Sequence, residues 1–417
     1  MSGALPRSQR GALLVMRKMT VGLVSHLVRD YNLGCSALAV SNIRLMDSVF
    51  AEYDVQPCYR VILPEPRYPV DLASYTSLVG VTSNPYEYRT YPRLKATIKN
   101  PSLIRKSDAF DGCDLVVDLC GGDGYTDNYG ITRLIAESLA IEHAKAHGAP
   151  IVFAPQTIGP FNTRLGRAVA KRELGKLAAL FVRDDKSLAC CRELGIDVPL
   201  QQVIDVAFAL PFEKRDQSNG KLNVGLNVSG LLYSGGYDHK NYFGLSFSYR
   251  DFVDELVRRL SDDEGIAVHL VPHVVASDGG EGGVDDDYSA CVDLRSRHPG
   301  VILPEPFESA SEAKSYISSL DFFSGARMHS TIGAISSGVP VVPVAYSRKF
   351  NGLYGTLGYP YLIDAKADLT IDGALDLFFD YFGRRDELAE AVERAKSVYL
   401  DGLSRYCEGF AKAAGLA

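Results

Sequence analysis

The sequence has no apolar run near the ~20 residues that a membrane-spanning helix requires. It also lacks an excess of basic residues: 44 Lys and Arg stand against 51 Asp and Glu, the net charge is −7, and no long basic block occurs. An integral membrane protein and a dedicated nucleic-acid binder are therefore not expected. The 417 residues are 46% hydrophobic and 23% charged, which is typical of a folded protein with two or three domains.

Cysteine is scarce and follows no pattern. Eight cysteines occur, and none belongs to a CxxC pair, so a disulfide framework is not expected. Buried, reduced thiols are typical of a cytoplasmic protein, which is the location we expect. No stretch has the ligand spacing of a metal site.

Targeting and catalytic signatures are missing as well. Basic residues flank a short apolar patch at 12–16, which falls short of the 7–15 apolar residues of a signal peptide, so residues 1–18 are expected to be a disordered leader. The sequence has no GxxxxGK[ST], HExxH or GxSxG, and no GxGxxG opens the first expected helix. No single motif therefore assigns a reaction.

Short β-branched runs alternate with helical patterns along the chain. In the first half the expected strands are 21–27, 115–119, 151–154 and 179–182, and the expected helices are 36–50, 131–147 and 167–177. This rhythm favours a parallel sheet with helices on both faces. A polar stretch at 211–221 predicts a linker.

After the linker the rhythm restarts with an expected strand at 222–228, and a further strand is expected at 301–303. The chain closes with an amphipathic helical pattern over 386–414. The predicted fold is therefore α/β, with two Rossmann-like domains facing a cleft, residues 19–210 and 222–417, the second ending in the closing helix. Ligands of such folds bind beyond the carboxyl ends of the strands.

The sharpest chemical signal lies in the second domain, directly after the strand-like run at 321–323. Arg327 and His329 are two residues apart and precede a helix, so they can project to the same side above free N–H donors. This pattern suits an anionic substrate that also needs a proton. The alternative is a histidine that caps the helix and an arginine paired with a nearby acid.

Further candidates stand at other strand ends. Arg183 follows the strand at 179–182 and would face the same cleft, or else would form a surface pair with Asp184 or Asp185. Gln156 and Lys349 also follow strands. Glycine turns at 32–34 and 121–124 could bring backbone N–H groups to an anion, although glycine is needed there as often for its conformation.

Together these segments resemble the polysaccharide pyruvyl transferase family. The resemblance extends from about residue 21 to about residue 358. It rests most specifically on Arg-Asp-x-x-Ser at 183–187 and Arg-x-His-Ser at 327–330, with support from 31–34, 118–124, 156–160 and 339–349. It implies a two-domain fold like that of GT-B glycosyltransferases, with the acceptor on the first domain and the donor on the second.

The resemblance implies an enzyme that moves pyruvate from phosphoenolpyruvate onto two hydroxyls of a sugar, giving a cyclic ketal and phosphate. The acceptor would be a polysaccharide or its lipid-linked precursor. A lipid-linked acceptor would bring the protein to the inner face of the membrane without anchoring it. No cofactor and no metal is implied, and the number of subunits is left open.

The family's site residues carry over position by position. Its donor-binding arginine falls on Arg183, and its Arg-x-His segment falls on Arg327, Met328 and His329, with Ser330 next to them. The two arginines would hold the phosphate and carboxylate of phosphoenolpyruvate, with backbone amides from Met328 to Ser330 assisting. Protonated His329 would act as general acid toward the methylene carbon.

The acceptor side is less defined. Contacts to the acceptor or the cleft are expected from residues at strand ends: Asn32, Gly34, Asp118, Gly122, Asp123, Asp127, Gln156 and Lys349. The three aspartates are candidates for the base, although such residues often cap or turn the chain. Cys35 stands where the family usually has Asp, and Asp123 replaces the third of three glycines, so both departures concern the acceptor.

Two other functions fit the same residues. A glycosyltransferase of this architecture would place a cation and a helix N-terminus at the diphosphate of a nucleotide sugar, with Asp364 as the candidate ribose contact. A non-catalytic relative would keep the donor pocket without turnover, and Cys35 and Asp123 are the features that favour it.

Overall fold

The computed structural model describes residues 16–65, 70–80, 84–217, 219–275 and 283–417. The predicted leader comprises residues 1–18, and its residues 1–15 lie outside the described residues. The prediction is wrong for its last two residues, because Arg17 and Lys18 open strand β1 (Arg17–Val24) and pair with the start of β2 (Val55–Pro64). Their side chains are exposed while their backbone is held in the sheet, so their charge gives no sign of the strand.

The first domain is built on a sheet of seven parallel strands in the order β3-β2-β1-β4-β5-β6-β7. Beside β1 and β2, its strands are β3 (Tyr86–Tyr91), β4 (Leu115–Asp118), β5 (Ile151–Gln156), β6 (Ala179–Val182) and β7 (Leu200–Gln202). Strands β4, β5 and β6 are buried throughout, as expected of apolar strands covered on both faces. Val117 and Phe181 face one apolar core, and Val116 and Val182 face a second.

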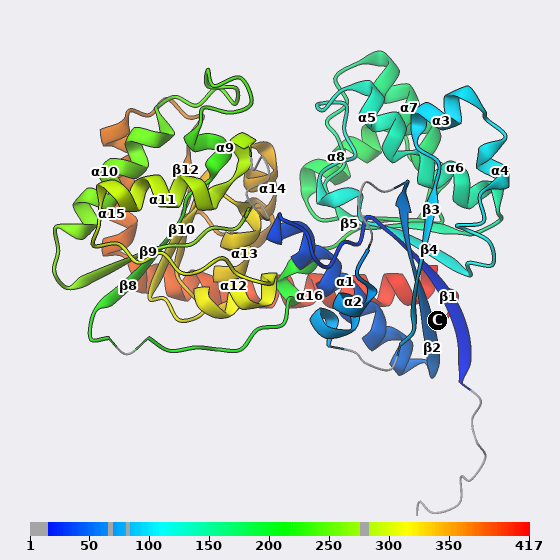
Figure 1. Ribbon diagram of the computed structural model, residues 1–417, viewed down its shortest axis with the longest axis horizontal. Helices are drawn as coiled ribbons and strands as arrows, with labels where there is room; N and C mark the ends of the chain where they lie inside the picture. The colour runs from blue at the N-terminus through cyan, green and yellow to red at the C-terminus, as the bar shows by residue number, and fades with distance from the viewer. Residues whose placement is uncertain (1–15, 66–69, 81–83, 218, 276–282) are drawn as a thin grey trace, which may run out of the picture.

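Helices cover both faces of this sheet (Figure 1). They are α1 (Leu33–Glu52), α2 (Leu72–Val79), α3 (Leu94–Lys99), α4 (Leu103–Lys106), α5 (Ile131–Glu137), α6 (Leu139–Ala146), α7 (Arg164–Leu174) and α8 (Asp185–Leu194), with short 3-10 turns η1 (Cys120–Gly122) and η2 (Val206–Ala209). The single helix expected over 131–147 is two helices that meet at Ser138.

The second domain has five parallel strands in the order β12-β11-β10-β8-β9. The strands are β8 (Leu222–Asn227), β9 (Ile266–Leu270), β10 (Phe322–Gly325), β11 (Val341–Ala345) and β12 (Ile363–Asp364). The strand expected at 301–303 is only a single bridge between Ile302 and His269. Two parallel sheets layered with helices confirm the predicted α/β class.

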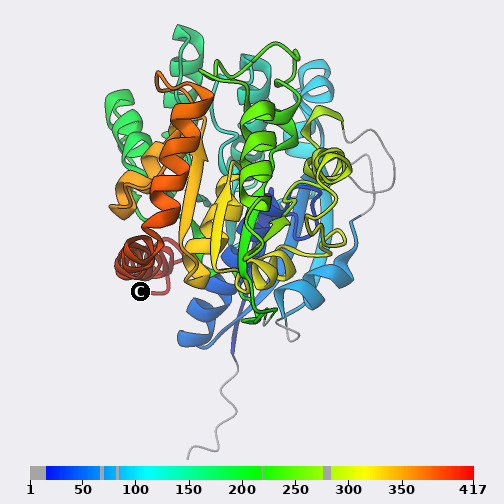
Figure 2. The ribbon, with the colours of Figure 1, turned by 90° about the vertical axis from the view of Figure 1, so that its left-hand side faces the viewer.

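Figure 2 looks onto this second domain, with helices in front of and behind the sheet. They are α9 (Gly230–Tyr233), α10 (Tyr249–Ser261), α11 (Asp287–Arg297), α12 (Ala310–Ile317), α13 (Met328–Ser337), α14 (Arg348–Leu357), α15 (Ile371–Gly383) and α16 (Arg385–Ala413), with the 3-10 turn η3 (Gly283–Asp285). Residues 211–217, in the predicted linker, have no helix or strand and run along α12, where Ser315 and Ser318 accept hydrogen bonds from Glu213 and Arg215.

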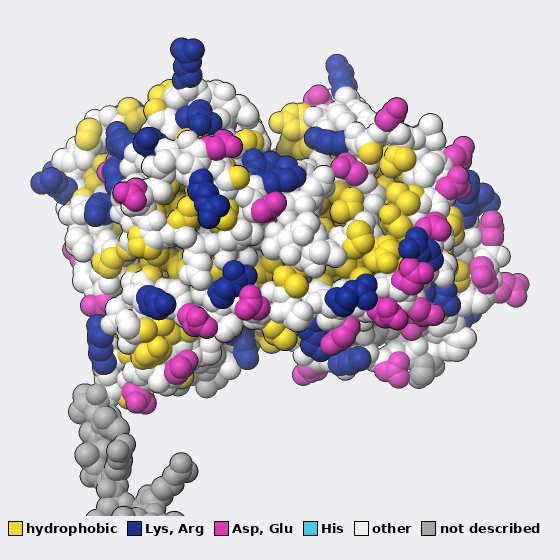
Figure 3. Space-filling model, turned by 180° about the vertical axis from the view of Figure 1, so that it is seen from behind, with side chains coloured by type: hydrophobic (Ala, Val, Ile, Leu, Met, Phe, Trp, Pro, Cys, Tyr) yellow, Lys and Arg dark blue, Asp and Glu magenta, His cyan; other side chains and the backbone are white. Residues whose placement is uncertain are grey.

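The C-terminal helix α16 crosses from the second domain back to the first (Figure 1). The hydroxyl of Tyr406 donates to Asn42 over 2.6 Å, and the ring of Phe410 packs against that of Phe50. The apolar stripe expected on this helix is thus buried between the domains, and its charges face outward. On the back of the molecule basic and acidic side chains are interspersed (Figure 3). Among the described residues no helix is long and apolar enough to cross a bilayer.

The domains also join through backbone hydrogen bonds beside the N-terminus of α1. The Leu33 N–H donates to the His273 carbonyl over 3.0 Å, and the Val275 N–H donates to the Tyr31 carbonyl over 2.9 Å. Asn32 and Val274 form the bridge between these bonds. The loop after β1 is therefore tied to the loop after β9, and the carboxyl ends of both sheets lie at one interface.

Candidate active site

Strand ends of both domains bring charged side chains to this interface. Arg183 follows β6 and Asp205 follows β7, while His329 lies in the first turn of α13, directly after β10. Lys349 lies in the first turn of α14, after β11. All four stand beyond the carboxyl ends of parallel strands, where ligands bind in this class of fold.

A buried ion pair forms the centre of the site on the first domain. Arg183 donates from Nη1 to Oδ2 of Asp205 over 2.6 Å and from Nε to the Thr157 hydroxyl over 2.9 Å. Arg183 is 2% exposed, and Asp205 is fully buried. Burial opposes the charge of Asp205, but Arg183 and His329 outweigh burial and lower the pKa of its carboxyl. The surface pair of Arg183 with Asp184 or Asp185 does not form.

Asp205 is a functional candidate that sequence reasoning missed. The available signal was an acid directly after the apolar pair Val203 and Ile204 at a strand end.

Nη2 of Arg183 donates no hydrogen bond to any described residue, so this arginine keeps one donor for an anion. Gly122 lies against this guanidinium. Its φ is +88°, and a Cβ at this position would lie 2.5 Å from the Leu38 side chain. Glycine is therefore required at 122.

His329 approaches the ion pair from the second domain. Its Nε2 lies 3.6 Å from Oδ2 of Asp205, and no described residue forms a hydrogen bond with this nitrogen. The ring packs on the first turn of α1, where a Cβ at Gly34 would lie 2.3 Å from Nδ1. Gly34 therefore makes room for the imidazole, which is 15% exposed at the cleft.

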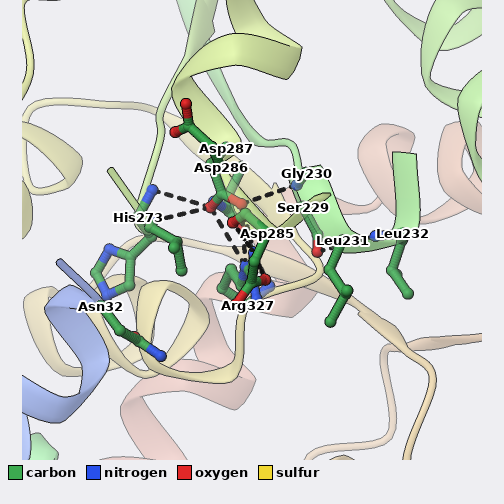
Figure 4. Close-up of polar contacts among 12 residues, drawn as sticks. Asn32, Ser229, Gly230, Leu231, Leu232, His273, Asp285, Asp286, Asp287 and Arg327 are labelled. Carbon is green, nitrogen blue, oxygen red and sulfur yellow. Dashed lines mark hydrogen bonds and ion pairs between the residues drawn. The ribbon is translucent and has the colours of Figure 1, made fainter. Parts of the chain in front are cut away.

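Arg327 is paired with acids of its own domain (Figure 4), which is the alternative that the sequence left open. Nε and Nη2 donate to Asp287, and Nη2 also donates to Asp285 over 2.7 Å. Asp287 is fully buried and also accepts the backbone N–H of Gly230 over 2.8 Å and that of His273 over 3.1 Å. Burial opposes the charge of Arg327, but the two aspartates raise its pKa. Of the three guanidinium nitrogens of Arg327, only Nη1 has no acceptor among the described residues.

His273 is a second residue that sequence reasoning missed. Its ring is 4% exposed, and neither nitrogen has a partner among the described residues. Burial and the positive charges of His329 and Arg327 lower its pKa to about 3, so the ring is neutral. It lies beside Asn32 at the junction of the domains (Figure 4).

The N-terminus of α13 offers backbone donors. Met328 and His329 occupy its first two positions, whose N–H groups have no intrahelical acceptor. Ser330 does not add to them, because its N–H and its hydroxyl both donate to the Arg327 carbonyl, over 3.1 Å and 2.8 Å. Its expected contact with the donor is therefore not supported by its geometry.

Lys349 joins the domains by an ion pair. Its Nζ lies 3.0 Å from Oδ2 of Asp123. Burial opposes both charges, yet each partner stabilises the other, so the pKa of Asp123 is lowered and that of Lys349 is raised. Cys35 lies nearby, and burial together with Asp30 and Asp123 raises the pKa of its thiol to about 12. The thiol is neutral at ordinary pH.

Three further candidates from the sequence lie on the first domain, and their hydrogen bonds differ. Asp118 is buried, accepts the Cys120 N–H over 2.9 Å, and has its pKa raised to about 6 by burial. Gln156 donates to the Asp118 carbonyl over 3.2 Å, and its Oε1 has no partner among the described residues. Asn32 caps α1 by accepting the Gly34 N–H.

Asp127, a cleft candidate from the sequence, is held by contacts within the first domain. Its carboxylate accepts the backbone N–H groups of Asn162 and Thr163, each over 2.8 Å, and also the Thr163 hydroxyl. Both oxygens therefore hold the loop before α7. Asp127 is a capping residue of the kind that the sequence left as the alternative.

A groove of 1320 Å³ opens in the first domain beside these residues. Apolar side chains make up much of its lining, including Leu27, Leu63, Leu94 and Ile98, and exposed cations at its rim include Arg93, Lys95 and Lys99. Cys35 and Gly121 are among its lining residues, and Gly121 is followed by Gly122, which contacts Arg183, and Asp123, which pairs with Lys349. Sequence reasoning missed the groove, because its walls come from loops, strand ends and helices that are far apart in the sequence. Among the described residues no cluster could hold a metal ion.

Solved structures with the same fold are enzymes of nucleotide-sugar chemistry. The S. aureus MnaA–UDP structure aligns with a TM-score of 0.59 at 12% identity, over 96% of this chain and 98% of the other. UDP-GlcNAc 2-epimerase from Neisseria meningitidis bound to UDP-GlcNAc aligns with a TM-score of 0.56 at 10% identity, over 95% and 100%. The pneumococcal O-GlcNAc transferase GtfA in complex with UDP and GlcNAc aligns with a TM-score of 0.56 at 11% identity, over 95% and 98%.

At these identities the likeness shows the fold, which is the GT-B architecture predicted from the sequence. A comparison with curated proteins found no match. The family model described as polysaccharide pyruvyl transferase matches residues 71–348, which is more than half of the chain and includes Arg183, Arg327 and His329. The chain therefore belongs to the polysaccharide pyruvyl transferase family, a family of enzymes.

Proposed function

We propose that this protein transfers the pyruvyl group of phosphoenolpyruvate to two hydroxyls of a saccharide, forming a cyclic ketal and releasing phosphate. The observation that carries the proposal is the cluster of Arg183, Asp205 and His329 at the domain interface, beside the groove of the first domain. The cluster combines an arginine that keeps a free donor with a histidine that can hold a proton. These are the two needs of a donor that is anionic and must be protonated.

In this scheme the donor lies between Arg183 and the N-terminus of α13. Nη2 of Arg183 and the amides of Met328 and His329 would bind its phosphate and carboxylate. Nη1 of Arg327 is a further donor for the same anions, while the rest of that guanidinium stays on Asp285 and Asp287. Lys349 would add positive charge on the far side of Asp123.

The chemistry then needs two steps. His329 protonates the methylene carbon of phosphoenolpyruvate, which leaves an oxocarbenium-like centre at C2, and the first sugar hydroxyl bonds to that carbon. The C2–O bond to phosphate then breaks as the second hydroxyl bonds to C2 and closes the ketal. One hydroxyl proton replaces the proton that His329 gave up, and the other leaves with the phosphate.

The groove supports an acceptor with an apolar part. Its apolar lining and cationic rim suit a saccharide joined to an apolar aglycone, and a lipid-linked precursor is one such acceptor. A location at the membrane surface would follow from that acceptor. The charged outer face of α16 would contribute little, because three of its basic residues, Arg394, Lys396 and Arg405, pair with acids of the same helix.

The test is a calorimetric titration with phosphoenolpyruvate, UDP-glucose and GDP-mannose in parallel, followed by a phosphate-release assay with p-nitrophenyl glycosides as acceptors. Binding of phosphoenolpyruvate alone, with phosphate release that depends on the glycoside, is the expected result. Binding of a nucleotide sugar instead would indicate glycosyl transfer. For that function Asp364 is poorly placed, because it already accepts the Lys366 N–H and the Asn351 amide. Binding of phosphoenolpyruvate without turnover on any acceptor would favour the non-catalytic relative.

A further inference from the structure

One carboxylate stands where the groove of the first domain meets the cluster around Arg183. Asp30 lies in the loop after β1 and lines the groove together with Cys35. Cys35 is also close enough to Asp123 and Arg183 for both charges to act on its thiol. Asp30 is therefore positioned between the space for an acceptor and the residues expected to hold the donor.

Two hydrogen bonds hold Asp30 in place, one to its carboxylate and one from its backbone. Its Oδ1 accepts the Asn32 N–H over 2.8 Å, and its own backbone N–H donates to the Ser36 hydroxyl over 2.9 Å. Oδ2 accepts no hydrogen bond from any described residue and remains available to the groove. The turn that holds Asp30 is the one that carries Gly34, on which the His329 ring packs.

The other acids near the site are buried, paired with a cation or placed on other elements. Asp118 is 1% exposed and bonded to the Cys120 N–H, and Asp123 is paired with Lys349. Glu137 faces Arg133 over 3.5 Å on α5, and Asp71 caps α2. Of the groove-lining carboxylates, only Asp30 stands on the loop shared with the donor site.

We infer that Asp30 is the general base that accepts the proton of the first attacking sugar hydroxyl. The inference rests on the proposed function. As the hydroxyl oxygen bonds to C2 of the donor, its O–H electron pair becomes the new C–O bond, and its proton passes to Oδ2 of Asp30. His329 supplies a separate proton to C3, and before the next turnover Asp30 releases its proton to solvent while His329 takes one up from solvent. Burial raises the pKa of Asp30, which makes its carboxylate a better proton acceptor than an exposed one.

Asp30→Asn isolates this role, because asparagine keeps an oxygen for the Asn32 N–H. Asp263→Asn is the matched control: Asp263 lies in the turn before β9, outside the groove, and also accepts an N–H two residues ahead, that of Gly265 over 2.8 Å. Turnover is followed as phosphate release from phosphoenolpyruvate with the p-nitrophenyl glycoside that reacts best with the wild type. Donor affinity is measured separately by calorimetry.

We expect Asp30→Asn to lower kcat roughly 100-fold or more with unchanged affinity for phosphoenolpyruvate, while Asp263→Asn keeps wild-type kcat. The wild-type rate should fall as the pH drops through the pKa of Asp30, and this acidic limb should be absent in Asp30→Asn. Tyr31 and Cys35, close to Asp30 along the chain, have raised pKa values and stay neutral in this range. The other charged groups of the groove are unchanged in Asp30→Asn, so an acidic limb that they cause would persist in that variant; they are Arg29 on the same loop and, on other elements, Asp71, Arg93, Lys95, Lys99, Arg133 and Glu137.

Wild-type kcat in Asp30→Asn, or an unchanged acidic limb, would overturn the inference. If that variant does not fold, Asp30→Glu carries the test, because it keeps the carboxylate and should retain both part of the turnover and the acidic limb. If Asp30→Glu folds and binds phosphoenolpyruvate but loses both the turnover and the acidic limb, Asp30 has a structural role. A wild type that neither binds phosphoenolpyruvate nor releases phosphate would instead refute the proposed function, and the inference with it.

Discussion

Nε2 of His329 lies 3.6 Å from Oδ2 of Asp205, the oxygen that also accepts Nη1 of Arg183. One buried carboxylate of the first domain therefore faces a cation of its own domain and a histidine of the other. The second contact exists only while the two domains are closed, because the partners follow strands of different sheets. Domain closure thus assembles the residues proposed to bind and protonate the donor.

His329→Ala tests the proton donor. We expect turnover to fall roughly 100-fold or more, since general acid catalysis contributes on this order. Affinity for phosphoenolpyruvate should change little, because Arg183 and the first-turn amides of α13 remain. Phosphate release and calorimetry measure the two quantities. Near-normal turnover would remove His329 from the acid role.

The two arginines should respond differently to substitution by alanine. Arg183→Ala should weaken binding of phosphoenolpyruvate by about 1.5–3 kcal/mol, the worth of one charge-assisted hydrogen bond. Arg327→Ala should mainly lower the free energy of unfolding, by about 3–5 kcal/mol, because it leaves the buried Asp287 without its cation. Denaturant unfolding and calorimetry separate these effects. Equal loss of donor affinity in both folded variants would show that Nη1 of Arg327 also holds the donor.

Gly34→Ala tests the space for the imidazole. Alanine favours a helix over glycine, so the change should not weaken α1 by itself. Its Cβ would lie 2.3 Å from Nδ1 of His329, and the ring must therefore move. We expect kcat to fall with little change in donor affinity. The matched control is Gly355→Ala in α14, where a Cβ meets nothing within 4 Å, and this variant should keep wild-type turnover.

The pair of Asp123 and Lys349 can be tested by exchanging its charges. Lys349→Glu places two carboxylates across the domain interface and should weaken both closure and binding of phosphoenolpyruvate. Adding Asp123→Lys to the same chain restores opposite charges and should recover part of the closure. The radius of gyration from small-angle scattering and the donor affinity report the outcome. A double variant no better than Lys349→Glu would show that the pair does not act in closure.

Lys314 predicts a pH dependence of stability. It is 2% exposed and donates to the Leu210 carbonyl over 2.8 Å, and burial lowers its pKa to about 7 from 10.5. Between these values the unfolded chain binds a proton that the folded one lacks, so the free energy of unfolding should rise with pH, by up to roughly 4 kcal/mol. Lys314→Met should remove this part of the slope. Denaturant unfolding from pH 7 to 10 measures it, and an unchanged slope would contradict the prediction.

Much of the fold was predictable because its signals are local. Apolar runs such as Leu115–Asp118, followed by turns and helical patterns, indicate buried parallel strands wherever they occur. The stripe of α16 likewise predicted a buried helix. Strand β3 was missed, because none of its first five residues is fully buried and its sequence, Tyr-Glu-Tyr-Arg-Thr-Tyr, does not form an apolar run.

The sequence by itself determined the α/β class, the two-domain order and the family segments, including Arg183 and His329, since each depends on residues close together in the chain. Only the tertiary structure decided their partners. Whether an arginine is free or paired depends on acids far away in sequence, and so Arg327 proved to be held by Asp287, 40 residues earlier. Asp205, His273 and the groove lined by Asp30 became visible for the same reason: they acquire their surroundings when loops of separate strands meet.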